Sequence, residues 1–136
     1  MGNEGNRRGF TLIELMVVIM IVGVLAAVMV PILRERNEAS KWSEAAATAG
    51  TIRSVVRAAF AEDPATVGAW TNQAVTGVMS DLGFMTGEFI GRYFDDSHFT
   101  IASVDANGNV TITVTAPAGL TGTGQLDGAN GWVYTP

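Results

Sequence analysis

The chain has 136 residues, with 8 Lys and Arg against 13 Asp and Glu, one His, no Cys and a net charge of −5 at pH 7. This length accommodates one compact domain plus an additional segment, but not two full domains. The acidic balance gives no reason to expect direct nucleic-acid binding, which favours basic surfaces. The absence of cysteine excludes a disulfide framework, a thiolate metal site and a Cys/His catalytic pair.

The chain opens with a short leader, residues 1–9, that contains Arg7 and Arg8. The next five residues read Phe-Thr-Leu-Ile-Glu, from Phe10 to Glu14, and an uncharged apolar run occupies residues 15–33. As a helix, these 19 residues extend over about 28 Å, close to the thickness of a membrane's hydrocarbon layer. A carboxylate at the start of such a segment opposes insertion by a few kcal/mol, so Glu14 is a candidate functional residue.

Two other interpretations of this N-terminus are open. A secretory signal peptide has an apolar core of about 7–15 residues followed by a small-residue cleavage site, whereas the run here is longer and has no convincing site of that kind. A plain membrane anchor accounts for the apolar run but leaves Glu14 unexplained. The two arginines of the leader favour a cytoplasmic N-terminus, although basic residues also follow the run, at 34, 36 and 41.

The order of Gly9, Phe10, the lone Glu14 and the apolar helix resembles the N-terminus of type IV pilins and of the related type II secretion pseudopilins. The resemblance implies that a membrane-embedded prepilin peptidase cleaves the Gly9–Phe10 bond and N-methylates Phe10. It also implies that Glu14 meets the N-terminal amine of an adjacent subunit and sets the register of filament assembly. The chain is then a substrate of that peptidase, and we expect neither enzymatic activity nor a cofactor.

Gly23 and Pro31 lie at positions where pilin helices commonly carry the same residues. Proline removes one helical hydrogen bond and clashes with the preceding turn, and glycine adds backbone freedom. The two residues therefore mark a segment that can kink when subunits pack. The alternative is that they are simply tolerated, because neighbouring helices satisfy the freed backbone groups.

The helical pattern continues to about Ala61, so we expect one helix from Phe10 to that residue. Apolar side chains recur there at intervals of three and four, as in one face of an amphipathic helix. These residues are Trp42, Ala45, Ala46, Ala49, Ile52, Val56, Ala59 and Phe60. Glu38, Lys41 and Glu44 have the spacing of a solvated polar face. The Asp63-Pro64 pair is expected to end the helix.

The rest of the chain predicts a small antiparallel sheet. A short helix is expected around residues 72–82. Period-two alternation at 99–104 and 110–115, separated by Asn107-Gly108, predicts a β-hairpin. A Gly-rich loop at 119–131 then leads to a last strand at 132–135. The expected fold class is α+β, a long N-terminal helix packed on about three antiparallel strands.

We therefore expect three parts: residues 1–9 as prepilin leader, 10–33 as transmembrane and filament-core helix, and 34–136 as amphipathic helix with a globular head. No metal site is expected. His98 is the one histidine in the sequence and is interpreted as an ordinary strand-edge residue. Calcium binding by Asp95 and Asp96 with Asp81 and Glu88 is an alternative, but these residues lack EF-hand spacing.

The resemblance implies a filament subunit that polymerises with copies of itself. The resemblance adds the peptidase/methyltransferase, an inner-membrane assembly platform and its ATPase motor as partners. It places the chain in the inner membrane before assembly, with a cytoplasmic N-terminus and an external head. A pseudopilin of a type II secretion system, and a minor, adhesive or DNA-uptake pilin, are the alternatives. An electron-transfer role is not favoured, because few aromatic residues lie on the long helix.

Overall fold

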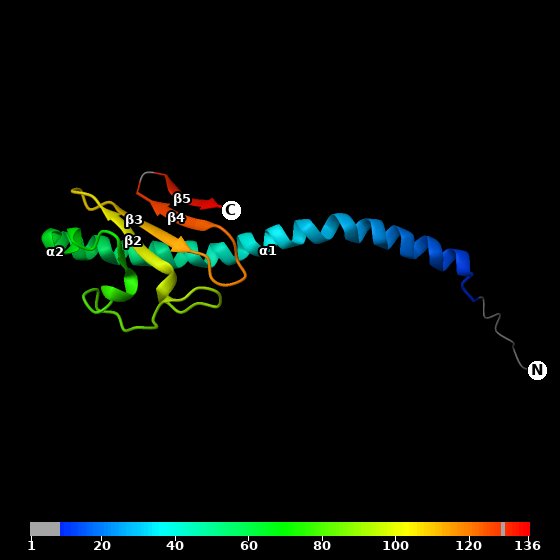
Figure 1. Ribbon diagram of the computed structural model, residues 1–136, viewed down its shortest axis with the longest axis horizontal. Coiled ribbons are helices and arrows are strands. Elements are labelled where there is room, and N and C mark those ends of the chain that lie inside the picture. The colour runs from blue at the N-terminus through cyan, green and yellow to red at the C-terminus, as the bar shows by residue number, and fades with distance from the viewer. Residues whose placement is uncertain (1–8, 129) are drawn as a thin grey trace, which may run out of the picture. The chain divides into compact units, whose positions relative to one another are not determined.

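The computed structural model describes residues 9–128 and 130–136; Arg7 and Arg8, which belong to the predicted leader, lie outside this range. One helix dominates the chain: α1 (Leu12–Glu62) has 51 residues (Figure 1). The chain divides into two compact units, and the boundary lies within α1, between Asn37 and Glu38. Each unit is described by itself below.

The first unit contains the apolar part of α1. Every described residue up to Asn37 is exposed, including the large hydrophobic side chains between Leu12 and Leu33. By length and composition α1 can cross a membrane. The helix is continuous through Gly23 and Pro31.

In the second unit, Glu38–Pro136, the amphipathic part of α1 forms one side of the hydrophobic core. Its fully buried residues are Trp42, Ala45, Ala49, Ile52 and Val56. Ala59 and Phe60 are partly buried against the same cluster. These positions follow the predicted spacing of three and four residues, so the expected apolar face of the helix is confirmed.

The long helix ends close to the predicted position. α1 stops at Glu62, and Asp63 then caps the short helix α2 (Pro64–Gly68). Its carboxylate accepts hydrogen bonds from the backbone N–H groups of Ala65 and Thr66, at 3.2 Å each. The side chain and backbone of Thr66 are the main reasons why the pKa of Asp63 is lowered. Pro64 fits the first turn because that position needs no N–H donor.

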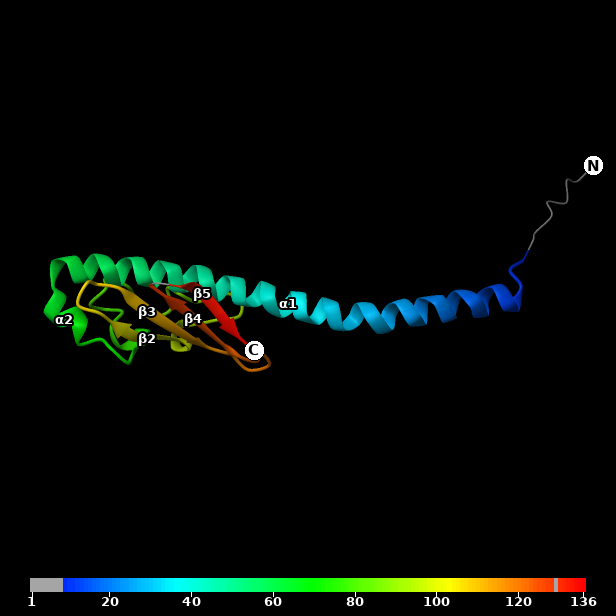
Figure 2. The ribbon, with the colours of Figure 1, turned by 90° about the horizontal axis from the view of Figure 1, so that it is seen from above.

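The sheet has five antiparallel strands in chain order, not about three as the sequence predicted. They are β1 (Gln73–Ala74), β2 (Phe99–Val104), β3 (Val110–Thr115), β4 (Thr123–Asp127) and β5 (Gly131–Thr135). The strands lie along the part of α1 that belongs to this unit (Figures 1 and 2). The α+β class is thus confirmed, and the strand count is corrected.

Both additional strands have weak sequence signals. β1 has two residues, which pair with Ile101 and Thr100 of β2. β4 lies inside the segment that was interpreted as a Gly-rich loop, where glycines normally weaken a strand. Its pairing with both β3 and β5 compensates for the poor local propensity.

The prediction of a short helix around residues 72–82 is wrong. Asn72 has a positive φ of 62°, β1 follows it, and the only helical element of this segment is the 3₁₀ turn η1 (Val75–Gly77). The β-branched residues and the glycine of this turn are poor helix formers. The apolar spacing of Val75, Val78 and Met79 nevertheless serves the core, because all three side chains are buried.

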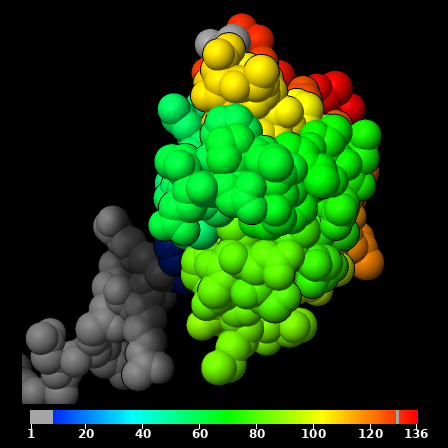
Figure 3. All heavy atoms as spheres, turned by 90° about the vertical axis from the view of Figure 1, so that its left-hand side faces the viewer, coloured from blue at the N-terminus to red at the C-terminus, as the bar shows by residue number. Residues whose placement is uncertain are grey.

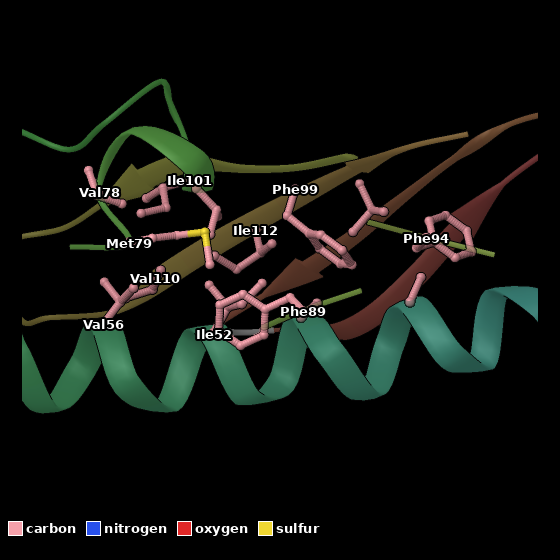
Figure 4. Close-up of a cluster of buried hydrophobic side chains, with 14 of the residues drawn as sticks. Ile52, Val56, Val78, Met79, Phe89, Phe94, Phe99, Ile101, Val110 and Ile112 are labelled. Atoms are coloured by element: carbon pink, nitrogen blue, oxygen red, sulfur yellow. The ribbon is translucent and has the colours of Figure 1, made fainter. Parts of the chain in front are cut away.

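The core lies between α1 and the inner face of the sheet (Figure 4). Ile52 and Val56 of α1 point toward Ile112 and Val110 of β3, and Phe99 of β2 lies beside them (Figure 4). All of these side chains are fully buried. Burying one such side chain contributes about 1.5–3 kcal/mol, so this contact stabilises the whole unit.

The predicted hairpin between β2 and β3 is confirmed. The carboxylate of Asp105 accepts the backbone N–H groups of Asn107 and Asn109, at 2.8 Å each. Hydrogen bonds from Asn109, with its side chain first, lower the pKa of Asp105. Gly108 has a φ of +76°, and a Cβ there would lie 2.6 Å from the Phe60 ring. The hairpin turn therefore packs against the end of α1, beside α2 (Figure 3).

An aromatic cluster connects the C-terminal strand to α1. The ring of Trp42 lies 5.0 Å from that of Tyr134 and 6.3 Å from that of Trp132, between centroids. Gly124 of β4 makes this arrangement possible, since a Cβ there would lie 2.3 Å from Trp132 and 2.9 Å from Trp42. The C-terminus is therefore held by strand pairing and aromatic packing.

We predict that Gly124→Ala destabilises the second unit by about 1–3 kcal/mol, because the added methyl group overpacks two indole rings. Thermal unfolding of the detergent-solubilised chain, followed by tryptophan fluorescence, measures the effect. Gly50→Ala is the matched control, because none of the residues that the structure describes has an atom in contact, within 4 Å, with its Cβ position on α1. The free energy of unfolding of this control should rise by up to about 1 kcal/mol, because alanine has a higher helix propensity than glycine. Equal stability of the two variants would contradict the packing argument.

Candidate functional site

The predicted cleavage position lies in exposed, non-helical chain. Gly9 and Phe10 precede α1, and the Phe10 side chain is 93% exposed. Among the described residues, none approaches within 4 Å of a Cβ placed on Gly9. The described part of the chain therefore leaves the Gly9–Phe10 bond open to another protein.

Glu14 closes the N-terminal end of α1 through a reciprocal capping box with Thr11. Its Oε2 accepts hydrogen bonds from the backbone N–H and from the hydroxyl of Thr11, both at 2.8 Å. In return, the Thr11 hydroxyl oxygen accepts the backbone N–H of Glu14 at 3.3 Å. A carboxylate is favourable here because it complements the partial positive charge of the helix N-terminus.

Thr11 is a residue that our sequence interpretation missed. The signal was present, since a threonine followed three residues later by a glutamate, before an apolar run, is a capping-box pattern. Gly23 and Pro31, the expected kink positions, are both exposed, and within the described part of the chain nothing lies within 4 Å of a Cβ on Gly23. There is thus room at Gly23 for another helix to approach closely.

A second carboxylate with a structural role is Glu44, which was interpreted as part of a solvated face. Its Oε1 accepts the backbone N–H groups of Tyr93 at 3.0 Å and Phe94 at 3.2 Å. A Cβ on Gly91 would lie 2.1 Å from the same oxygen, so a side chain there would displace the carboxylate from this position. Glu44 therefore fastens the loop before η2 (Asp96–His98) to α1. A single sequence gives no signal for a contact across 49 residues.

Asp96 holds the other end of this loop. Its side chain is 95% buried, and its carboxylate accepts the backbone N–H groups of Gly87 and Phe89, the latter at 3.0 Å. A buried carboxylate needs such partners, because an unpaired one is costly. The calcium hypothesis had placed Asp96 among metal ligands, whereas here its oxygens bind backbone donors.

Asp95 and His98 form the cap of η2. The carboxylate of Asp95 accepts the backbone N–H and the hydroxyl of Ser97, and lies 2.9 Å from Nδ1 of His98. The Ser97 hydroxyl is the main reason why the pKa of Asp95 is lowered, and His98 adds a smaller electrostatic contribution. Within residues 9–128 and 130–136, no group of three or more His, Asp or Glu side chains is arranged to hold a metal.

Comparison with known proteins supports the resemblance. The family described as "Prokaryotic N-terminal methylation motif" matches residues 5–30. The fimbrial protein EcpC of Eikenella corrodens is 30% identical over 79% of this chain and 63% of its own length. A type IV major pilin protein PilE1 of Neisseria gonorrhoeae is 36% identical over 62% of this chain and 37% of its own. A fimbrial protein of Pseudomonas aeruginosa is 26% identical over 90% of this chain and 75% of its own.

The chain spans less than two thirds of the length of the Eikenella and Neisseria relatives. No solved structure matches it. The fold and the exposed apolar helix define a pilin-like α+β protein with a prepilin-type methylation motif. The motif and these relatives support the resemblance to the type IV pilin family, since the relatives are named as a type IV major pilin and as fimbrial proteins.

We predict that Glu44→Ala accelerates hydrogen exchange at the amides of Tyr93 and Phe94 by about tenfold. The reason is that bonds to a charged acceptor contribute about 1.5–3 kcal/mol, and less where the carboxylate is partly exposed. Gly91→Ala should also accelerate exchange at these two amides, because the added methyl group displaces the Glu44 carboxylate. Glu38→Ala, on the same helix, is the control and should leave the exchange rates of these amides unchanged. Slow exchange in Glu44→Ala would show that the loop is held by packing alone.

Proposed function

We propose that this chain is the structural subunit of a type IV pilus-like filament. It is made as a prepilin, cut after Gly9, N-methylated at Phe10 and polymerised through its apolar N-terminal helix. The observation that carries the proposal is the continuous apolar surface of residues 12–33, which no described part of the chain covers. A surface of this kind is stable only in a membrane or against other apolar surfaces.

In this proposal the apolar helix occupies these two environments one after the other. Before assembly it lies in the inner membrane, with the N-terminus cytoplasmic and the second unit outside the cytoplasm. In the filament it packs against copies of itself. Apolar burial contributes about 25 cal/mol per Å², so even partial packing of this helix outweighs one ion pair. The peptidase, the assembly platform and its ATPase are the partners that this pathway requires.

Glu14 supplies specificity rather than strength in this scheme. Both of its hydrogen bonds from Thr11 go to Oε2, so within the described residues Oε1 accepts no hydrogen bond. That oxygen is free to accept the amine of an adjacent subunit's Phe10. Since an unpaired charge in apolar surroundings is costly, such a pair favours one register of two neighbouring helices.

The nearest alternative is a pseudopilin of a type II secretion system, and a minor, adhesive or DNA-uptake pilin is the next. The methylation motif alone does not separate these roles. The relatives found are named as a major pilin and as fimbrial proteins, which favours the pilus subunit.

The proposal is tested by shearing surface filaments from cells and measuring the intact mass of this protein in the sheared and membrane fractions. We expect abundant sheared protein that begins at methylated Phe10. Mature protein confined to membranes would favour a pseudopilin or minor subunit instead. A chain that keeps its leader would overturn the proposal.

We predict that Glu14→Ala is cleaved and methylated normally but gives about tenfold fewer filaments or worse. The reason is that loss of one partner from an ion pair in apolar surroundings costs a few kcal/mol. Quantifying the sheared subunit against the membrane pool measures this. Glu35→Ala removes the same charge from an exposed position farther along α1 and should assemble normally. Wild-type filament yield from Glu14→Ala would contradict the assigned role.

A further inference from the structure

The loop of residues 85–93 exposes an unusual amount of apolar surface. In the described part of Glu38–Pro136, four large hydrophobic side chains are exposed, and three of them belong to this loop. They are Met85 at 78%, Ile90 at 65% and Tyr93 at 39%; Val133 on β5 is the fourth. Concentration on one loop, rather than scatter, indicates a contact surface.

Two cations flank the aromatic ring of this loop. The Nζ atom of Lys41 lies 5.3 Å from the centroid of the Tyr93 ring, and the Cζ atom of Arg92 lies 5.5 Å from it. Residues 38–136 contain four Lys and Arg against ten Asp and Glu, so half of these cations meet at one tyrosine. The fold creates this arrangement, because Lys41 and Arg92 are far apart in the sequence.

Two carboxylates of this region, those of Glu44 and Glu88, are engaged with backbone donors. Glu44 accepts the N–H groups of Tyr93 and Phe94, which fixes the loop beside Lys41. Glu88 accepts the N–H of Met85 at 3.1 Å. Within the described residues no salt bridge involves Lys41 or Arg92, so their cationic groups remain available to an external anion.

We infer that Lys41, Ile90, Arg92 and Tyr93, here called the loop patch, bind the headgroups of anionic phospholipids while the subunit is inserted in the membrane. The inference rests on the proposed membrane-inserted state. Lys41 follows the end of the apolar run by only eight residues. Tyr93 lies between two basic side chains, and the exposed aliphatic Ile90 precedes it by three residues on the same loop. This composition is typical of a membrane–water interface.

Other ligands fit the loop patch less well. Nucleic acid requires a longer track of cations than two residues provide, on a surface that is otherwise acidic. A second copy of the chain would cover the apolar residues but gives no reason for two cations around one ring. A lipid surface uses both features, because it offers anionic headgroups above an apolar layer.

The test uses the full-length chain in vesicles of phosphatidylcholine, with or without phosphatidylglycerol. The sequence has no cysteine, so Thr86→Cys introduces a unique site for a fluorophore on the exposed part of the loop. Nitroxide-headgroup lipids then quench a fluorophore that contacts the surface. Ala106→Cys, in the β2–β3 turn, provides a distant reporter. Flotation of the vesicles reports insertion independently.

We expect quenching at Thr86→Cys that is stronger with phosphatidylglycerol, weaker at high salt and absent at Ala106→Cys. Lys41→Gln with Arg92→Gln should lower the surface-bound population by on the order of tenfold, because each cation near an anionic surface contributes measurably. Arg53→Gln with Arg57→Gln removes the same charge elsewhere on α1 and should leave quenching unchanged.

Three results would overturn the inference while leaving the filament proposal intact. They are equal quenching with both lipids, equal loss in the two double variants, and quenching that disappears at one chain per vesicle, which would mean that a second copy covers the loop. A chain that fails to float with vesicles contradicts membrane insertion itself, and the inference with it.

Discussion

The exposed apolar surface of residues 12–33 is the constraint on which the rest of this chain depends. A soluble protein rarely leaves a continuous surface of this kind open, because hydration of that area is unfavourable. In the second unit, by contrast, the apolar face of α1 is buried, because the sheet covers it from Trp42 onward. α1 therefore has two apolar parts. The part from Trp42 onward is buried within the chain, whereas the part at residues 12–33 is stable only in a membrane or against another apolar surface.

Backbone donors engage many of the acidic side chains. Glu14 and Asp63 cap helices, Asp105 closes a hairpin turn, and Glu44 and Asp96 hold the two ends of one loop. Each replaces a contact that irregular backbone would otherwise need to make with water. The acidic composition thus has a structural use in a chain without disulfides, because short carboxylate bridges fix loops that no covalent bond restrains.

The parts of the fold that the sequence predicted are those with a strong local pattern. The apolar face of α1 and the hairpin at Asn107-Gly108 follow from periodicity and turn chemistry within a few residues. β1 and β4 could not be predicted in this way, since a two-residue strand has no period and Gly124 argues against a strand. The pairing of neighbours and the packing of Trp42 and Trp132 on that glycine decide the structure there.

The residues of the candidate site likewise fall into those with a local sequence signal and those whose role depends on contacts distant in the sequence. Glu14 was identified because a charge beside an apolar run violates a local rule, and Thr11 belongs to a local pattern as well. Glu44 looked like an ordinary member of a solvated face, because its partners at Tyr93 and Phe94 come from a loop with no sequence periodicity. The contact that holds this loop on α1 also sets Tyr93 beside Lys41. A carboxylate that stabilises the fold therefore determines which cations the surface presents, and composition alone gave no indication of that arrangement.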